Sequence, residues 1–177
     1  MVDLKKIYDR HTQVGRKDLG GEAPLNDEIQ LILLIIFLVV WCIDSFWFRQ
    51  TTFLSTFVPL FIRILLGILF LVWWAYLTWH GLAIIFGEER AMPSVVRNGP
   101  FGYVRHPIYL ASILFYLGLT AFTFSLASFV FIIITIIYYN FTAIYEEKLL
   151  IAKYGDEYKK YMAEVGRWLP KFRNLGR

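Results

Sequence analysis

Cysteine is nearly absent from the sequence: of 177 residues, only Cys42 carries a thiol. A single thiol excludes an internal disulfide and cannot build a cysteine metal cluster, so no metal site is predicted. Charge is also sparse, with 18% charged residues and a formal net charge of +4. This modest excess indicates contact with a membrane surface and gives no support for nucleic-acid binding. The chain also lacks the Gly-rich strand-to-helix motif of soluble nucleotide-binding folds.

Apolar residues, in contrast, are abundant. Hydrophobic residues make up 58% of the chain and aromatic residues 19%, which is more than a soluble domain of this size normally carries. A chain of 177 residues forms one domain and has little interior in which to bury such a surplus. A lipid bilayer removes this difficulty, so the composition predicts an integral membrane protein.

Four apolar runs predict four transmembrane helices, near residues 29–48, 59–86, 107–122 and 126–145. The first run matches the length of a helix that crosses about 30 Å of hydrocarbon, and Asn26 or Asp27 is placed to cap it. Pro59 and Pro107 suit the first turns of the second and third helices. The second run is longer than one crossing requires, so this helix is expected to tilt or to extend beyond the lipid.

Polar segments define the remaining organisation of the chain. We expect an N-terminal arm at residues 1–28 and one membrane domain at residues 29–177. Within this domain, the polar loop comprises residues 87–106 and the charged tail comprises residues 146–177. The break at residues 123–125 is short, so the last two spans form a hairpin. The tail is predicted to be helical to about Val165, with an interruption at Gly155. The predicted fold class is therefore all-α: a multi-pass transmembrane helical bundle of about four spans, with a C-terminal helical hairpin and a cytosolic C-terminal helical tail.

Basic residues lie mainly on one side of this topology. With both termini on the same side, that side receives five basic residues from the arm, three from the loop and eight from the tail, whereas the opposite side receives only Arg49. Cytosolic segments carry such an excess, so we expect the termini, the loop and the tail to face the cytosol. Two charges remain inside apolar runs. Asp44 is expected to make a polar contact, and Arg63 requires a partner that the sequence does not identify.

The same topology places two polar segments, residues 97–109 and 145–170, on one face of the membrane. Helices joined by a tight turn lie side by side, so His106 before the hairpin and Glu146 after it should be close. A site built there would lie at the membrane boundary, with water on one side and lipid on the other.

Glu146 and Glu147 are consecutive in the sequence. On a helix their side chains point about 100° apart, so they are not expected to share one target. One is expected to face the site, and the other to be solvated or paired with Lys148 or Arg105. The sequence leaves open which of the two faces the site.

The segments around the hairpin carry an ordered series of motifs. The series comprises Arg97-Asn98-Gly99-Pro100-Phe101-Gly102-Tyr103-Val104-Arg105-His106-Pro107-Ile108-Tyr109, then Glu146-Glu147, Tyr154-Gly155-Asp156-Glu157-Tyr158, Tyr161 and Leu169-Pro170. In this order and spacing the motifs resemble those of the isoprenylcysteine carboxyl methyltransferase and phospholipid methyltransferase family. Members of this family are integral membrane methyltransferases with a helical fold, unlike the soluble Rossmann-type methyltransferases.

The resemblance implies a site for S-adenosyl-L-methionine between the loop, the hairpin and the tail. Transferred by position, the expected cofactor-binding residues are Gly99, Pro100, Phe101, Arg105, His106, Tyr109, Glu146, Glu147, Tyr158, Tyr161 and Pro170. Neutral His106 can donate or accept a hydrogen bond, and a carboxylate at the membrane edge suits a sulfonium cofactor. We expect Glu147 and Arg167 to be catalytic.

The resemblance also implies that the methyl acceptor is carried by a lipid, with the bilayer as the other partner. Members that methylate a prenylated cysteine carboxylate often place an Arg and a Pro around a Val near the end of the tail. This chain has Glu164-Val165-Gly166-Arg167 at the matching stretch. Arg167 is a substitute cation for a carboxylate acceptor, whereas a phospholipid amine would accept Glu164 as a base. Both acceptors stay open, and the oligomeric state is not predicted.

Two alternatives belong to other functional classes. Membrane sterol reductases carry a comparable His-Pro-x-Tyr motif and bind NADPH, but they usually have many more spans. A non-enzymatic membrane assembly protein is the second alternative. Four predicted spans together with Glu146-Glu147 favour the methyltransferase over the reductase.

Overall fold

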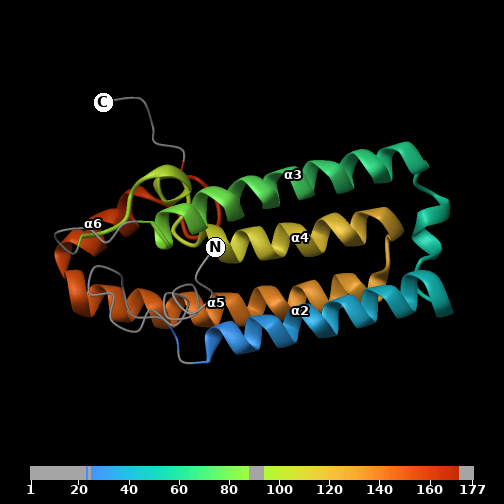
Figure 1. The fold of residues 1–177 in the computed structure, drawn as a ribbon, viewed down its shortest axis with the longest axis horizontal. Helices are drawn as coiled ribbons and strands as arrows, with labels where there is room; N and C mark the ends of the chain where they lie inside the picture. Colours follow the sequence, from blue (N-terminus) through green and yellow to red (C-terminus); the bar gives the residue numbers. More distant parts are fainter. Residues whose placement is uncertain (1–22, 24, 88–93, 172–177) are drawn as a thin grey trace, which may run out of the picture.

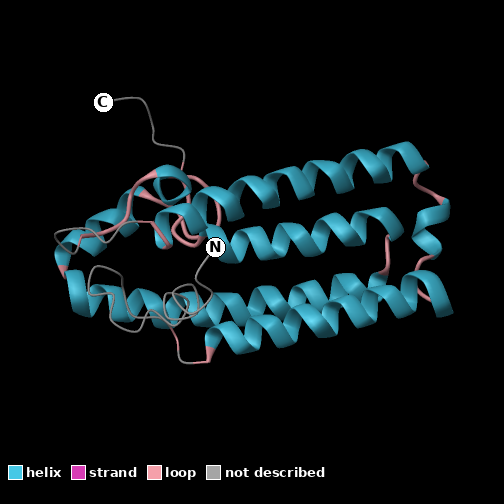
Figure 2. Ribbon diagram, in the orientation of Figure 1, coloured by secondary structure: helices cyan, strands magenta, loops and turns pink. Residues whose placement is uncertain are grey.

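The computed structural model describes residue 23, residues 25–87 and residues 94–171 of the chain. Most of the predicted arm and residues 88–93 of the predicted loop therefore lie outside the described residues. The described elements are α2 (Asn26–Cys42), η1 (Ile43–Phe48), η2 (Phe53–Thr56), α3 (Leu60–Ile85), η3 (Gly99–Gly102), α4 (Pro107–Thr123), α5 (Leu126–Tyr154) and α6 (Asp156–Glu164). η1 is a π-helical continuation of α2, and η2 and η3 are short 3₁₀ turns. Figure 2 shows helices and loops without a strand in this part of the chain, which confirms the predicted all-α fold.

The four long helices lie side by side (Figure 1). α3 packs along α4, α2 packs along α5, and α4 also contacts both α2 and α5. η3 and α6 lie at one end of the bundle, which we call the site end, whereas η1, η2 and the α4–α5 turn lie at the opposite end (Figure 1). The last two apolar helices thus form the predicted hairpin, with both of its open ends at the site end.

Glycines allow α3 and α4 to approach each other closely. A Cβ atom at Gly118 would lie 2.9 Å from two carbons of the Leu71 side chain and 3.3 Å from the Gly67 carbonyl oxygen. A Cβ atom at Gly67 would lie 2.5 Å from the ring of Phe122. Small residues at such contacts are typical of packed transmembrane helices, and here they fix the position of α4 against α3.

Local signals explain several of the helix boundaries. Pro107 is the first residue of α4, where its missing N–H leaves no helical bond unmade. Ser125 caps α5, because its side chain accepts a hydrogen bond from the Ser128 N–H. Gly155 ends α5 with φ 57° and ψ −128°, a conformation that favours glycine, so the predicted interruption of the tail is confirmed.

The predicted cap of the first span is wrong. α2 begins after Leu25, and no side chain caps it. Asn26 is only 2% exposed, and its side-chain nitrogen donates to the Tyr109 hydroxyl at 2.8 Å. The side chain that was expected to cap the helix instead makes a tertiary contact with α4.

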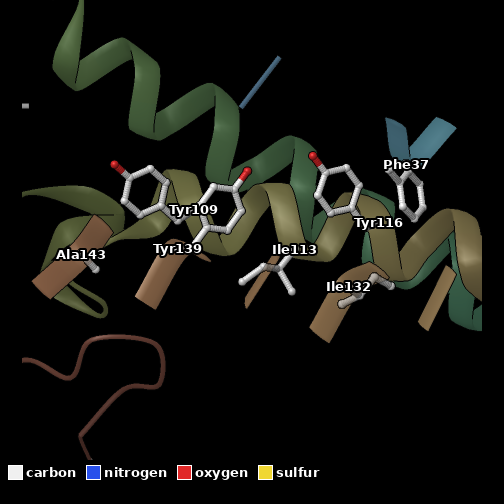
Figure 3. Close-up of a cluster of buried hydrophobic side chains, with 7 residues drawn as sticks. All are labelled: Phe37, Tyr109, Ile113, Tyr116, Ile132, Tyr139 and Ala143. Carbon is white, nitrogen blue, oxygen red and sulfur yellow. The ribbon is translucent and has the colours of Figure 1, made fainter. Parts of the chain in front are cut away.

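The core lies between α2, α4 and α5. Figure 3 shows its buried side chains, which are Phe37, Tyr109, Ile113, Tyr116, Ile132, Tyr139 and Ala143. The rings of Phe37 and Tyr116 lie 4.4 Å apart, centre to centre, and those of Tyr109 and Tyr139 stack at 4.9 Å. Aromatic contacts therefore join all three helices along the length of the core.

The outer surface of the bundle is apolar. Three described helices are long and apolar enough to cross a membrane, at Asn26–Phe48, Leu60–Ile85 and Leu126–Tyr154. Large apolar side chains point outward from α3 and α5, including Leu65, Val72, Trp79, Ile133 and Phe141. A soluble protein rarely exposes so continuous an apolar surface, so the bundle fits a membrane protein. α4 is also apolar but shorter, with 17 residues, and a count of four spans stays a prediction.

Candidate active site

The tail is attached to the loop at the site end. The Arg105 N–H donates to the Gly166 carbonyl oxygen at 2.9 Å, beside a bridge between Val104 and Gly166. The Tyr161 hydroxyl donates to the Phe101 carbonyl oxygen at 2.6 Å. These bonds hold α6 and the residues after it against the loop, although the bonded positions lie about 60 residues apart in sequence.

Glu147 lies at the centre of a buried charge cluster. Both Arg105 and Arg167 bind its carboxylate, with their closest contacts at 2.9 Å and 2.6 Å respectively. Arg105 also donates to the carbonyl oxygens of Met162 and Val165. Because Glu147 is only 2% exposed, its charge is compensated by these two guanidinium groups, which join α5 to the loop and to the tail.

Glu146 has different surroundings. Its carboxylate accepts a hydrogen bond from the Tyr109 hydroxyl at 2.5 Å, and Tyr109 in turn accepts one from Asn26. The Tyr138 hydroxyl completes this chain by donating to the Asn26 side-chain oxygen at 3.2 Å. Glu146 is therefore positioned from α4, and indirectly from the first turn of α2.

His106 lies between the two glutamates. Its Nδ1 is 3.6 Å from a Glu146 oxygen, and its Nε2 is 3.3 Å from a Glu147 oxygen. The Nε2 contact with Glu147 is a hydrogen bond, whereas the Nδ1 contact with Glu146 is longer than one, so both carboxylates lie near one imidazole ring but only Glu147 binds it. Glu147 pairs with Arg105, which was one of the two partners expected for the glutamate that does not face the site.

Burial controls the protonation of this site. It lowers the pKa of His106 below the ordinary value of 6.5, although the adjacent Glu147 acts in the opposite direction. Burial also raises the pKa of Tyr158 and of Tyr161 above the ordinary value of 10.0. His106 is therefore neutral at pH 7, and both tyrosines keep their protons.

A cavity of about 270 Å³ opens beside these residues, close to the lower end of the range of about 300–1,000 Å³ for small-molecule sites. Every described helix except η1 and η2 contributes residues to its wall, either from the helix itself or from its ends. The polar part of the lining includes Asp27, Gln30, Arg105, His106, Tyr109 and Glu146, and the aromatic part includes Phe86, Phe101, Tyr154, Tyr158 and Tyr161. Two carboxylates, a neutral imidazole and several aromatic rings thus face one cavity.

The sequence model of the phospholipid methyltransferase family matches residues 61–157, which is more than half of the chain. The chain belongs to the phospholipid methyltransferase family. The matched region contains the loop motif, the hairpin and both glutamates, whereas Tyr158, Tyr161, Arg167 and Pro170 follow it. Membership in this family implies methyltransferase activity. No curated protein matches the chain.

The predicted site residues of this phospholipid methyltransferase family member fall into two groups. The first group lines the cavity and comprises Phe101, Arg105, His106, Tyr109, Glu146, Tyr158 and Tyr161. The second group lies outside the lining and comprises Gly99, Pro100, Glu147, Arg167 and Pro170. Within the second group, Pro100 is buried in the loop, Pro170 is exposed, and Glu147 and Arg167 bind each other behind His106.

The residues of the site that were not predicted from the sequence include two members of the hydrogen-bonded chain and a partner of Arg167. Asn26 and Tyr138 extend the hydrogen-bonded chain that begins at Glu146. Asn140 accepts a hydrogen bond from Arg167 at 2.9 Å. A signal for Asn140 was present, because an amide inside an apolar span is costly and marks a functional or structural contact. Asn26 gave no such signal, since a polar residue at the start of a helix is also an ordinary cap.

Among the described residues, no group of histidine, cysteine, aspartate or glutamate side chains is arranged to hold a metal ion. The acidic residues of the site are instead bound by arginine and tyrosine side chains. The Glu146 carboxylate and the aromatic rings that line the cavity therefore suit an organic ligand with cationic and aromatic parts.

Proposed function

We propose that the chain is an integral membrane methyltransferase that uses S-adenosyl-L-methionine and methylates an acceptor carried by a lipid. The observation that carries this proposal is the cavity at the site end, which combines the Glu146 carboxylate with aromatic walls in a member of a lipid methyltransferase family. When bound, S-adenosyl-L-methionine supplies an electrophilic methyl group on a sulfonium cation. A carboxylate and aromatic faces are the groups that attract such a cation.

The residues of the cavity have separate roles in this proposal. Glu146 binds a cationic part of the cofactor, and the Tyr109 hydroxyl orients the Glu146 carboxylate. Neutral His106 hydrogen-bonds to the cofactor's ribose or carboxylate. Tyr158 and Tyr161 on α6 exclude water from the reacting groups. Because methyl transfer is an in-line displacement, these residues contribute mainly by holding donor and acceptor in line, about 3–3.5 Å apart.

We propose a positioning role for Glu147 and Arg167, in place of the catalytic roles expected from the sequence. Both oxygens of Glu147 are bound by Arg167, and one of them also by Arg105. A carboxylate acceptor needs a cation beside it, but the guanidinium of Arg167 already binds Glu147 and Asn140. Glu164, the base expected for an amine acceptor, is likewise engaged, by Arg97 at 2.8 Å. The preference for a phospholipid amine over an isoprenylcysteine carboxylate therefore rests on the family match.

The site end of the bundle also suits a lipid acceptor. The cavity lies between helices whose outer faces are apolar, so a lipid can reach it sideways while its acyl chains stay in the bilayer. The proposed orientation has the cavity, the loop and the tail on the cytosolic side, in accordance with the distribution of basic residues.

Cofactor binding tests the proposal directly. Purified protein in detergent is titrated calorimetrically with S-adenosyl-L-methionine, its demethylated product and NADPH. We expect the first two to bind and NADPH not to bind. His106→Ala and Glu146→Ala are expected to abolish binding, whereas Asp156→Asn, which removes an exposed carboxylate on α6, should bind normally. Full affinity in both site variants would refute this site, and binding of NADPH alone would indicate a reductase.

The acceptor is identified in a second experiment. Labelled S-adenosyl-L-methionine is incubated with the protein and with phosphatidylethanolamine, an isoprenylcysteine analogue or a water-soluble amine. Label in the phospholipid, and much less in the other two, is the expected result. Equal methylation of the water-soluble amine would contradict a lipid-borne acceptor, and labelling of the isoprenylcysteine analogue alone would contradict the amine.

A further inference from the structure

A second polar cavity is lined by residues at the opposite end of the bundle from the candidate active site; the elements of that end are seen in Figure 1. Its volume is about 260 Å³, and it lies between η1, η2, the start of α3 and the end of α4. Two arginines and four hydroxyl side chains line it, namely Arg49, Arg63, Ser45, Thr52, Ser55 and Thr123. The proposed methyl transfer uses none of these residues.

The cavity carries a positive charge that the described residues do not neutralise. Arg63 donates through Nη1 to the Phe122 carbonyl oxygen at 3.0 Å, but its Nε is buried and has no hydrogen-bond partner among the described residues. Neither Arg49 nor Arg63 forms an ion pair within the described part of the chain. The adjacent acid, Asp44, accepts hydrogen bonds from the backbone and side chain of Thr51 at 3.1 Å and 2.5 Å. Half-buried Arg63 and exposed Arg49 therefore both line a cavity that has no acidic residue in its lining.

Exposed aromatic rings surround this end of the bundle. Trp47 is 83% exposed and Phe57 is 78% exposed, and they are accompanied by Phe46, Phe48, Phe53 and Phe61. Trp is enriched at the level of lipid headgroups, where its amphipathic ring contacts both apolar and polar surroundings. With Trp47 at that level, Arg49 and Arg63 would lie near the lipid phosphates of the leaflet on this side of the membrane.

We propose that this cavity binds the phosphate group of a phospholipid headgroup, in the leaflet opposite the candidate active site. The planar guanidinium groups of Arg49 and Arg63 present paired N–H donors that match phosphate oxygens. The Ser55 and Thr123 hydroxyl groups of the lining supply further donors, whereas the Ser45 and Thr52 hydroxyls already donate to Thr123 and to the Arg49 carbonyl oxygen. The acyl chains of the same lipid lie along the exposed apolar surface of α2 and α3. This site is independent of the proposed methyltransferase activity.

The test measures stabilisation by ligands of matched chemistry. The full chain, purified in a neutral detergent, is unfolded thermally in the presence of dioleoylphosphatidylglycerol, dioleoylglycerol or inorganic phosphate. We expect phosphatidylglycerol to raise the unfolding temperature in a saturable manner, whereas dioleoylglycerol, which lacks the phosphate, should not. Inorganic phosphate at the same concentration should neither protect the protein nor compete with the lipid. Equal protection by dioleoylglycerol or by inorganic phosphate would overturn the proposal.

Variants locate the site. Arg63→Gln keeps a donor for the Phe122 carbonyl oxygen but loses the charge, and Arg49→Gln changes an exposed side chain. Each is expected to weaken the apparent affinity for phosphatidylglycerol about tenfold, which corresponds to about 1.4 kcal/mol. Lys160→Gln removes one positive charge from an exposed position on α6, at the other end of the bundle, and should leave this affinity unchanged. Unchanged affinity in Arg49→Gln, or an equal loss in Lys160→Gln, would show that the lipid binds elsewhere.

Discussion

Glu147 binds three side chains that come from different parts of the chain. Arg105 belongs to the loop, Arg167 to the tail, and His106 to the start of the hairpin. Removing one partner of a buried ion pair typically costs about 3–5 kcal/mol, because the remaining charge stays buried and unpaired. Glu147→Gln is therefore expected to lower the stability of the protein by about this amount, as measured by unfolding in detergent.

Glu146→Gln is the matched variant for this prediction. It retains an oxygen that can accept the Tyr109 hydroxyl hydrogen bond and leaves the contacts of Glu147 with Arg105 and Arg167 unchanged, so the loss of stability should be smaller. Its affinity for S-adenosyl-L-methionine should nevertheless fall strongly. If Glu147→Gln were fully stable but inactive, Glu147 would act in catalysis rather than in positioning.

His106 makes the stability of the protein depend on pH. Burial lowers the pKa of His106 in the folded protein below 6.5, its ordinary value, which applies to the unfolded chain. At a pH between the folded and the unfolded pKa, the unfolded chain therefore binds a proton that the folded protein does not. The free energy of unfolding should fall as the pH decreases below about 6.5, by up to about 1.4 kcal/mol per pH unit. Above pH 6.5 this histidine contributes no pH dependence.

The measurement compares unfolding of the wild type and of His106→Gln from pH 5 to pH 8. The variant should lack the part of the slope that His106 causes, while other titrating groups keep theirs. Identical slopes in the two proteins would show that the imidazole takes up a proton equally well in the folded state.

The sequence predicts individual site residues better than it predicts their contacts. The loop motif and the paired glutamates identified Arg105, His106, Tyr109 and Glu146, all of which line the cavity. The network that fixes them depends on residues far apart in sequence, such as Asn26 and Tyr109. Helix periodicity restricts a side chain to a face of its own helix, but it does not specify which residue of another helix that face meets.

At the scale of elements, Gly155 connects α5 to the helix that covers the cavity. Its φ of 57° with ψ of −128° is unfavourable for residues with a Cβ atom, at a typical cost of about 1–3 kcal/mol. Gly155→Ala should therefore destabilise the protein and displace α6, which carries Tyr158 and Tyr161. We expect weaker binding of S-adenosyl-L-methionine in calorimetry, together with a lower unfolding temperature.

Ala152→Gly is the control for this change. It lies on the exposed side of α5, one turn before Gly155, and costs about 1 kcal/mol through helix propensity. This variant should lose stability without losing cofactor affinity. Similar losses of affinity in both variants would indicate that α6 responds to general destabilisation and not to the conformation at Gly155.

The lengths of the helices follow from local signals, whereas the ends of the membrane spans do not. Pro107, Ser125 and Gly155 fix helix ends through backbone chemistry that the sequence displays. α5 continues to Tyr154, nine residues beyond the predicted end of its span, because a helix extends past the lipid without changing its hydrogen bonds. The apolar run ends where lipid is expected to end, and the helix ends at the first glycine that the chain supplies.

At the scale of the whole molecule, α4 is the most enclosed of the apolar helices, and it is shorter than α3, α5 and the 23-residue helix that α2 forms with η1. Its 17 residues rise about 26 Å at 1.5 Å per residue, which is less than the hydrocarbon thickness of about 30 Å. Eight of its residues are buried, compared with three in the longer α3. Packing against α2, α3 and α5 compensates for this short length, since protein rather than lipid surrounds most of the helix.

Cysteine labelling tests whether α4 nevertheless crosses the membrane. In a Cys42→Ser background, single cysteines replace Gln50, Asn98 or Lys160, which are exposed positions outside the long helices. If α3, α4 and α5 all cross, a membrane-impermeant maleimide should label Gln50→Cys from one side, and Asn98→Cys and Lys160→Cys only from the other. Labelling of Asn98→Cys and Lys160→Cys from opposite sides would mean that only one of α4 and α5 crosses, and the shorter α4 would then be the helix that does not. The loop and α6 could then not enclose one cavity, because the bilayer would separate Arg105 from Glu147.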